Sequence, residues 1–317
     1  MQHLKNQSTE KTKKNKKMFY EKVYEKYIDP FTDFGFKKLF GEENNRELLL
    51  DFLNELLHKD QGRIMKISYL NSERLGFSSN YRKAFFDIHC ENDKGEKFIV
   101  ELQKENQKFF KDRTVFYSTF PIVEQAPKIK KWNYKLKAVY VVAILDFVFD
   151  ENENDPLKYR YDVMLSDIET HKIFYDKLKF IYLEMPKFTK EVDEIKTNFE
   201  KWMYVIKNLN CLEEIPEKLR GRIFKKLFAA AEVAKLTPEE YKEYLSAINA
   251  YRDWQNVVDT AEAKGITKGL AEGLEKGLAE GLEKGLAEGL EKGLAKGEQE
   301  RLILQQKIEE LKKLLKN

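Results

Sequence analysis

Two carboxylates occur in the middle of segments that are otherwise typical of buried strands. Asp87 lies in FFDIHCEN, and Glu101 lies in KFIVELQK, fourteen residues further along the chain. The intervening NDKG predicts a tight turn with Gly95 at positive φ, so the two segments are expected to pair as a hairpin. Unpaired carboxylates held close together repel each other and shift their pKa values. A divalent cation between them would relieve that repulsion.

Strand periodicity predicts that the polar side chains lie on one side of this hairpin. Asp87 is predicted to share a face with Phe85 and His89, and Glu101 to share a face with Gln103. Mg²⁺ prefers one or two carboxylates, with waters at its remaining positions, so Asp87 and Glu101 are candidate metal ligands beside Gln103. A hairpin with one solvated face has the same pattern of residues. The spacing alone therefore leaves a metal site and an ordinary exposed hairpin open.

Segments on either side of the hairpin predict an α/β fold. Residues 18–44 contain Pro30, Gly35 and Gly41 and are interpreted as a turn-rich segment. Helical spacing of apolar residues predicts helices over 44–57 and 105–125. Apolar runs predict strands at 63–70, 83–92, 96–105, 137–149, 159–167 and 179–186. This order of elements predicts a mixed β-sheet flanked by helices.

From about residue 191 the pattern becomes helical. Three amphipathic helices are predicted over 199–209, 217–236 and 237–265. In the repeat that follows, GLAEGLEK occurs three times and glycine recurs every four residues from Gly265 to Gly297. A four-residue step turns a helix by about 400°, so the stripe of glycine and leucine winds around the helix in the right-handed sense.

The repeat has two interpretations. Each of its nine glycines costs about 1 kcal/mol relative to alanine, so an isolated helix would be marginal. A helix formed against a second copy of the chain would explain the stripe, and a loosely helical, charged spacer would explain it equally well. The ending, 298–317, predicts a short coiled-coil cap. Self-association into a homo-oligomer through this tail is our expectation.

The chain is thus expected to have four parts. Residues 1–17, with six lysines and one acid, are predicted to be a disordered basic tail. Residues 18–190 are predicted to form the α/β core, 191–264 a helical region, and 265–317 the repeat with its coiled-coil ending.

The composition bounds the class of protein. The net charge of +3 over 317 residues neither requires nor excludes DNA as a partner. Cys90 and Cys211 are isolated, which argues against a zinc site and fits a reducing cytoplasm. The longest apolar run, 138–145, is too short to span a bilayer, and the sequence contains no glycine-rich nucleotide-binding loop. We therefore expect a cytoplasmic protein without a membrane segment.

A longer series of motifs resembles a known family. DPFTDFGFKKLFG (29–41), FFDIHCENDKGEKFIVELQ (85–103), the FYS helix (116–118) and the glycine-glutamate-lysine tail are similar to the PD-(D/E)XK family of transposases and recombination-promoting nucleases. The resemblance extends over residues 28–300. It implies a restriction-endonuclease-like core that hydrolyses DNA phosphodiesters with Mg²⁺, for which Mn²⁺ would substitute. Asp87 and Glu101 match the acidic metal ligands of that family, and Gln103 stands where the superfamily usually has lysine.

The replacement of lysine by Gln103 changes the chemistry that this position can supply. Glutamine can orient a water or bond a phosphate oxygen, but it carries no positive charge and cannot act as a base. Lys104 is next in the chain, yet it points to the opposite face if the strand is regular. Gln103 is kept as a catalytic candidate beside Asp87 and Glu101, and Lys104 as a candidate DNA contact.

Other candidates come from the segments before and after the hairpin. Asp33 is a catalytic candidate, with a turn or cap acid as the alternative. Candidate phosphate contacts are Lys37 and Lys38, with ordinary surface lysines as the alternative. Arg113 and Tyr117 lie four residues apart on one helix face and are candidate DNA contacts, although packing of that helix explains Tyr117 equally well.

Three hypotheses for function follow. The first is a Mg²⁺-dependent DNA endonuclease associated with transposition or recombination. The second is a DNA- or protein-binding module that keeps the nuclease fold without activity, a reading that Gln103 keeps open and that Asp87 and Glu101 argue against. The third is an assembly protein whose function resides in the repeat.

Overall fold

The computed structural model describes residues 25–74, 84–105, 107–126, 132–152 and 155–314. The basic tail predicted over 1–17 lies outside them. Six strands form one mixed sheet in the order β1 (Ile67–Tyr69), β4 (Ile88–Asn92), β5 (Lys97–Gln103), β6 (Val139–Leu145), β8 (Ile173–Glu184) and β7 (Arg160–Ser166). The pairs β5–β6 and β6–β8 are parallel, and the other three are antiparallel. Two short strands, β2 (Glu73–Arg74) and β3 (Ala84–Phe85), pair separately.

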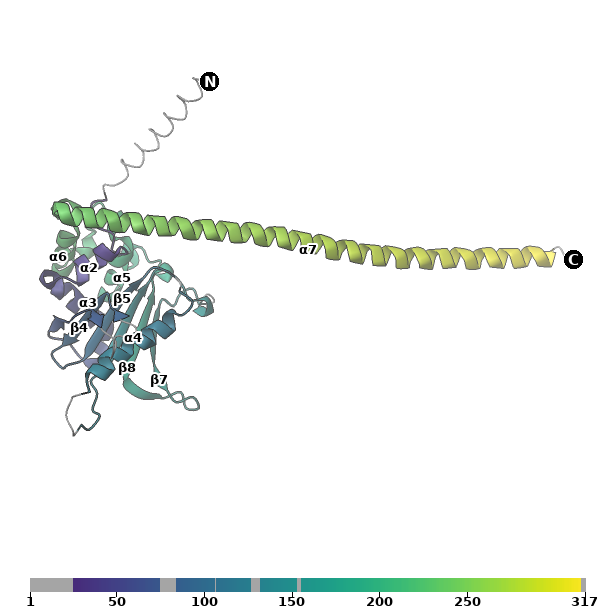
Figure 1. Cartoon of the computed structure of the whole chain (residues 1–317). Helices are drawn as coiled ribbons and strands as arrows, with labels where there is room; N and C mark the ends of the chain where they lie inside the picture. Colours follow the sequence, from purple (N-terminus) through teal and green to yellow (C-terminus); the bar gives the residue numbers. More distant parts are fainter. Residues whose placement is uncertain (1–24, 75–83, 106, 127–131, 153–154, 315–317) are drawn as a thin grey trace, which may run out of the picture. The chain divides into compact units, whose positions relative to one another are not determined.

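Among the described residues, one group of helices shares a core with one face of the sheet, and another helix packs on the opposite face (Figure 1). The first group is α2 (Asp33–Phe40), α3 (Arg46–Gln61), α5 (Asn198–Asn208) and α6 (Arg222–Ala231). The opposite face carries α4 (Phe110–Glu124). Every residue of β6 is buried, which the continuous apolar run VYVVAIL predicts for a central strand with two covered faces.

Aromatic side chains join the helices of the larger layer. Trp202 of α5 is fully buried, and its ring lies 5.7 Å from those of Phe40 in α2 and Phe52 in α3. Its indole Nε1 donates to Asp51 Oδ2 at 2.8 Å, so the polar end of the side chain is also satisfied. These contacts fix α2, which carries one side of the candidate site described below.

Short 3₁₀ helices connect the main elements. They are η1 (Glu43–Asn45), η2 (Asp150–Asn152), η3 (Met185–Lys187), η4 (Val192–Glu194), η5 (Leu209–Cys211), η6 (Glu217–Leu219) and η7 (Val233–Lys235).

Two expectations from the sequence are wrong in detail. The strand predicted over 83–92 is interrupted, because β3 ends at Phe85 and β4 begins at Ile88, with a bend at Asp87. The turn-rich segment contains a helix, α2, whose first turn is capped by the Thr32 hydroxyl accepting from the Gly35 amide at 3.0 Å. Gly35 is needed there because a Cβ at this position would lie 2.0 Å from the Asp29 carbonyl oxygen.

The last helix, α7 (Pro238–Leu314), runs through the repeat as one element of 77 residues. It begins as the sequence predicts, with Glu240 N donating to the Thr237 hydroxyl and Thr237 N to the Glu240 carboxylate. The chain divides into two compact units after Asn249. The boundary expected at residue 190 falls inside the first unit, since α5, α6 and the start of α7 share a core with α2 and α3.

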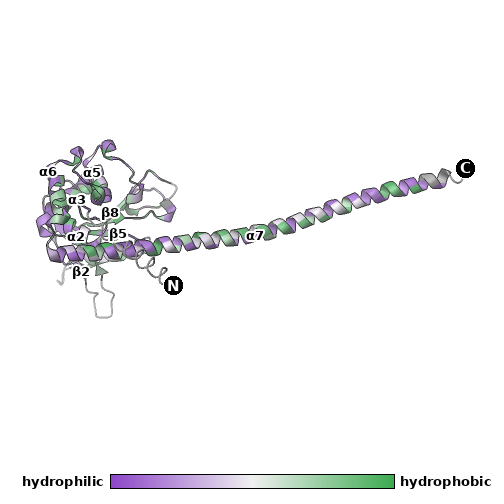
Figure 2. Ribbon diagram, turned by 90° about the horizontal axis from the view of Figure 1, so that it is seen from above, coloured by the Kyte–Doolittle hydropathy of each residue, from purple (hydrophilic) through white to green (hydrophobic). Residues whose placement is uncertain are grey.

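Hydrophilic and hydrophobic residues alternate along the helix of the second unit (Figure 2). The leucines of its repeat, from Leu270 to Leu294, are each 63–70% exposed. Within the described residues, no helix is both long and apolar enough to cross a membrane.

Candidate active site

Asp87 and Glu101 are held together by reciprocal hydrogen bonds. The backbone amide of Leu102 donates to Asp87 Oδ2 at 2.8 Å, and the backbone amide of Asp87 donates to Glu101 Oε1 at 3.3 Å. The β4–β5 register pairs Ile88 with Val100, so Asp87, which lies one residue before β4, is opposite Glu101. The two carboxylates therefore lie side by side, as the hairpin in the sequence predicts.

The bend also changes the surroundings of the predicted face. Phe85 is 60% exposed, whereas Phe86 is buried and packs on His89 with 5.2 Å between ring centroids. His89 is itself buried, and its Nδ1 lies 3.4 Å from the Asn71 carbonyl oxygen. The face expected to combine Phe85, Asp87 and His89 is thus not formed, because Phe86 takes the inward position.

Both carboxyl groups have raised pKa values. Burial raises the pKa of Glu101 well above its usual value, and the neighbouring Asp87 raises it further. Burial also raises the pKa of Asp87, against the hydrogen bond from the Leu102 amide. The positive charges of Arg113 and Lys37 lie near both carboxyl groups and lower their pKa values, which offsets part of the effect of burial. The pair therefore favours a proton or a cation.

Two carboxylates are a donor set that suits a hard divalent cation such as Mg²⁺ or Mn²⁺. Among the described residues, no group of three or more His, Cys, Asp or Glu side chains is arranged to hold a metal. Two carboxylates with waters at the remaining positions are instead what Mg²⁺ prefers. Asp87 and Glu101 supply this minimal set.

A hollow of about 230 Å³ opens beside Asp87. Its walls come from α2, from the end of β5 and from the segment after it: Asp33, Phe36, Asp87, Leu102, Gln103, Lys104, Glu105 and Gln107. Asp33 lies in the first turn of α2, with Lys37 Nζ 2.9 Å from its Oδ1. The segment interpreted as turn-rich thus brings Asp33 and Lys37 to the site on a helix.

Gln103 holds an arginine. The guanidinium of Arg113 donates to Gln103 Oε1 and, at 2.8 Å, to Gln107 Oε1, while Gln103 Nε2 donates to the Glu105 carbonyl oxygen at 3.0 Å. The guanidinium also lies over the rings of Phe110 and Tyr117, at 4.8 and 5.7 Å from their centroids. Both the oxygen and the nitrogen of the Gln103 amide are therefore hydrogen-bonded. The Arg113 guanidinium places a positive charge beside position 103, where the sequence has glutamine in place of lysine.

Lys104 lies differently from the expectation. Because β5 ends at Gln103, strand alternation no longer fixes the next side chain, and Lys104 lines the same hollow as Asp33 and Asp87. Burial lowers the pKa of Lys104, and the nearby Asp33, Asp29 and Asp87 oppose that shift. Lys104 thus joins Arg113 and Lys37 as a cation near the acidic pair.

Two other candidates have structural partners. Lys38 Nζ pairs with Glu42 at 2.9 Å and with Glu240 at 2.6 Å, which ties α2 to the start of α7. Tyr117 packs its ring on Phe86, at 5.3 Å between centroids, so helix packing accounts for much of its position.

Asp29 is a residue that sequence reasoning missed. Its Oδ1 accepts from the Phe31 amide at 2.8 Å, and its own amide donates to the Tyr244 hydroxyl at 2.9 Å. Burial raises the pKa of Asp29 to about 6, and Lys104 is among the charges that act on it. The DPFTDFG motif contained the signal, since it places two acids four residues apart around a helix start.

Comparison with known protein families matches residues 30–261 to the PD-(D/E)XK nuclease family transposase. No curated protein and no solved structure matches the chain.

Proposed function

The chain belongs to the PD-(D/E)XK nuclease family of transposases, and we propose that it is a Mg²⁺-dependent DNA endonuclease acting in transposition or recombination. Its mixed sheet with flanking helices is the α/β, restriction-endonuclease-like fold expected from the sequence. The observation that carries the proposal is the buried pair of Asp87 and Glu101, joined through backbone amides beside a polar hollow.

Asp87 and Glu101 are the proposed metal ligands. Mg²⁺ bound there, or Mn²⁺ in its place, would supply the positive charge that activates water and offsets charge building on the phosphate. The hydrogen bond from the Leu102 amide fixes the Asp87 carboxylate, so little reorganisation is needed for binding. Asp33 lines the same hollow, and we propose that it orients a water molecule bound to this Mg²⁺.

The cations around the pair are proposed to contact DNA phosphate. Arg113 is oriented by Gln103 and Gln107, which gives Gln103 a positioning role in place of the absent lysine. Lys104 and Lys37 approach from the other side of the hollow and from α2. Positive groups directed at the phosphate stabilise the transition state most when they are oriented in advance.

The cellular setting is also a proposal. Within the described residues Cys90 and Cys211 are free thiols, which supports a reducing cytoplasm. The exposed leucines of α7, spaced four residues apart along the repeat, support self-association with a second copy. We propose that this tail assembles the nuclease into a homo-oligomer.

A catalytically inactive DNA- or protein-binding module is the alternative, because Gln103 replaces the usual lysine. Plasmid nicking with Mg²⁺ separates the two. Isosteric Asp87→Asn and Glu101→Gln variants are each expected to lose at least about 100-fold in rate, since each removes a charge from the proposed metal site. Asp93→Ala is the matched control, because it removes an exposed acid from the turn of the same hairpin.

The outcomes are distinct. Nicking that requires metal and is lost in both isosteric variants but not in Asp93→Ala supports the nuclease. Equal nicking in all proteins places the activity elsewhere. Absence of nicking by folded protein that still binds DNA supports the binding module.

A further inference from the structure

Helix α4 carries an aromatic stripe on its solvent side. Phe109, at the helix start, is 65% exposed, and Phe116, seven residues later, is 42% exposed. Asp112 and Arg113 lie between them at helical spacing, so one face of α4 combines rings and charges. The buried face of the same helix is separate and is formed by Phe110, Thr114, Ser118 and Phe120 together with Pro121. The core therefore leaves Phe109 mostly exposed and Phe116 partly exposed, with the Phe116 ring 5.2 Å from that of the buried Phe120.

The stripe borders a hollow of about 430 Å³. Three aromatic residues line it, namely Phe109, Phe116 and Tyr117, and the remaining lining residues are Gln107, Lys108, Asp112 and Arg113. This volume is within the range of sites that hold small organic groups. Phenylalanine is among the residue types most often fully buried, so two exposed rings at one hollow mark an interaction site.

Cations accompany the rings. Lys108 Nζ lies 5.5 Å from the centre of the Phe109 ring, and the Arg113 guanidinium lies 5.7 Å from that of Tyr117. Asp112 is the one acid among the described residues that line this hollow. Rings with adjacent Lys and Arg are how proteins hold single-stranded nucleic acid, since bases stack on the rings while cations contact the backbone.

The hollow lies next to the candidate active site. Gln107 lines both hollows, and Arg113, which lines this one, donates to Gln107 and to Gln103 of the candidate active site. A phosphodiester at Asp87 would therefore place a flanking nucleotide next to α4. The bases of an intact duplex are stacked on each other, so only an unpaired base can reach the rings.

We propose that the hollow lined by Phe109, Phe116 and Tyr117 binds an unpaired nucleobase of the DNA strand whose phosphate occupies the candidate active site. The nuclease thus acts on single-stranded or locally opened DNA. This inference rests on the proposed function and adds the form of the substrate.

The test measures binding rather than cleavage. The full-length Asp87→Asn protein is titrated, with Mg²⁺ present, into a DNA oligonucleotide containing the fluorescent base 2-aminopurine, as a single strand and as a duplex. We expect tighter binding to the single strand together with quenching of the fluorescence by stacking. Adding Phe109→Ala and Phe116→Ala should weaken single-strand binding by roughly tenfold per ring and remove the quenching.

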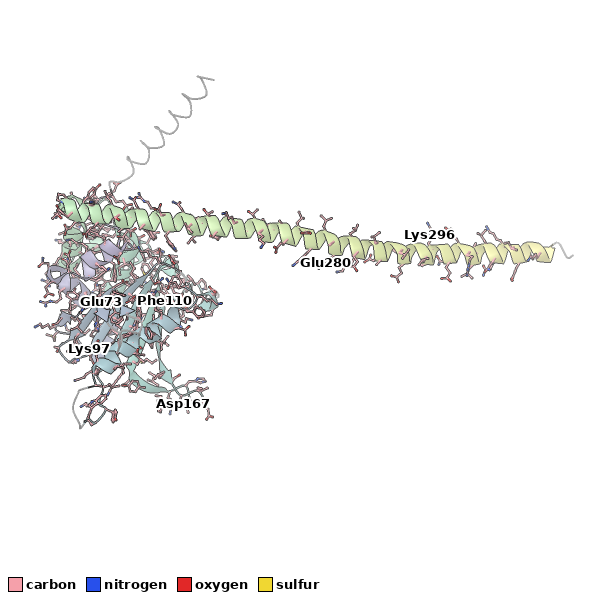
Figure 3. All side chains as sticks on the ribbon, viewed as in Figure 1. Glu73, Lys97, Phe110, Asp167, Glu280 and Lys296 are labelled. Atoms are coloured by element: carbon pink, nitrogen blue, oxygen red, sulfur yellow. The ribbon has the colours of Figure 1, made fainter. Side chains whose placement is uncertain are left out.

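Two further variants guard against misfolding and non-specific effects. Phe109→Tyr with Phe116→Tyr keeps the rings and should retain both the binding and the quenching. Phe174→Ala removes a still more exposed ring, 83% accessible, from β8 in the β7–β8 hairpin, and should change neither. Figure 3 labels Asp167 in that hairpin and Phe110 on α4, which lie apart.

Several results would overturn the inference. They are unchanged binding and quenching in the double alanine variant, an equal loss for duplex and single strand, and tighter binding of an RNA strand of the same sequence. Plasmid nicking by the unsubstituted protein is measured in parallel. If the unsubstituted protein nicks DNA and the double alanine variant still binds single-stranded DNA like its parent, the base-stacking site is refuted and the proposed function is not. Nicking that does not require Asp87 contradicts the proposed function instead.

Discussion

Replacing Asp29 by asparagine should stabilise the protein at neutral pH. The Asp29 carboxyl group has a pKa of about 6, raised chiefly by burial from 3.8. Between these two values the folded state binds a proton more tightly than the unfolded state, so stability falls as pH rises through this window and stays lower above it. One pKa unit corresponds to about 1.36 kcal/mol, so the penalty above pH 7 is about 3 kcal/mol.

Asparagine removes the charge and keeps an oxygen that can accept from the Phe31 amide. The free energy of unfolding of Asp29→Asn should therefore exceed that of the parent by about 3 kcal/mol at pH 8, and the two should be nearly equal near pH 4. For a unit of this size, this gain corresponds to a rise in Tm of roughly 6–12 °C. Urea unfolding followed by tryptophan fluorescence measures the difference, because Trp202 is fully buried in the same core.

Asp29→Ala provides the matched comparison. It removes the charge but also leaves the Phe31 amide without its acceptor, which costs about 1–3 kcal/mol. It should therefore be less stable than Asp29→Asn at every pH. A stability difference between Asp29→Asn and the parent that does not change from pH 4 to pH 8 would refute the reasoning, since a carboxyl group with a raised pKa requires that change.

Three further predictions concern the site and the tail. Lys104→Ala should slow plasmid nicking at least about tenfold, because it removes a cation from the hollow. Lys38→Ala should leave nicking unchanged and lower Tm, because Lys38 ties α2 to α7. Equal nicking by both variants would contradict the placement of Lys104. The rise in Tm caused by Mg²⁺ should grow from pH 5 to pH 8, since the raised pKa of Glu101 makes protons compete with the metal. In Glu101→Gln, Mg²⁺ should no longer raise Tm. A rise in Tm that does not depend on pH would place the metal elsewhere. A chain ending at residue 264 should form a smaller particle in light scattering yet still nick DNA, and an unchanged particle size would show that the core makes the oligomer.

The sheet could be predicted from the sequence because its strands carry strong local patterns. The run around β6 is apolar at every position, and the NDKG turn fixes the β4–β5 hairpin, with Gly95 at φ +79°. The pairing of these strands and the approach of Asp87 to Glu101 followed from that hairpin. The roles of these two residues as metal ligands remain predictions.

The details that the sequence did not indicate depend on tertiary contacts. FFDIHC contains no glycine or proline, so nothing local marks the bend at Asp87, which arises where the chain leaves its pairing with β2 and joins the sheet. Gly35 suggested a turn, yet its role is to let α2 approach the Asp29 carbonyl oxygen. The position of Lys104 depended on where β5 ends, and strand boundaries are set by neighbouring strands more than by propensity.

The distribution of charge bears on whether the protein is a nuclease or an inactive binding module. Asp29, Asp87 and Glu101 all have pKa values raised by burial, so each ionised carboxylate lowers the stability of the fold near neutral pH. They would also repel DNA phosphates, which a simple binding surface attracts with Lys and Arg. A binding module gains from neither effect. A metal-dependent nuclease gains from both carboxylates of the pair, because they hold a divalent cation that neutralises their negative charge and brings phosphate to where Arg113 and Lys104 already lie. The cost in stability at Asp87 and Glu101 is therefore the strongest physical argument for catalysis at this site.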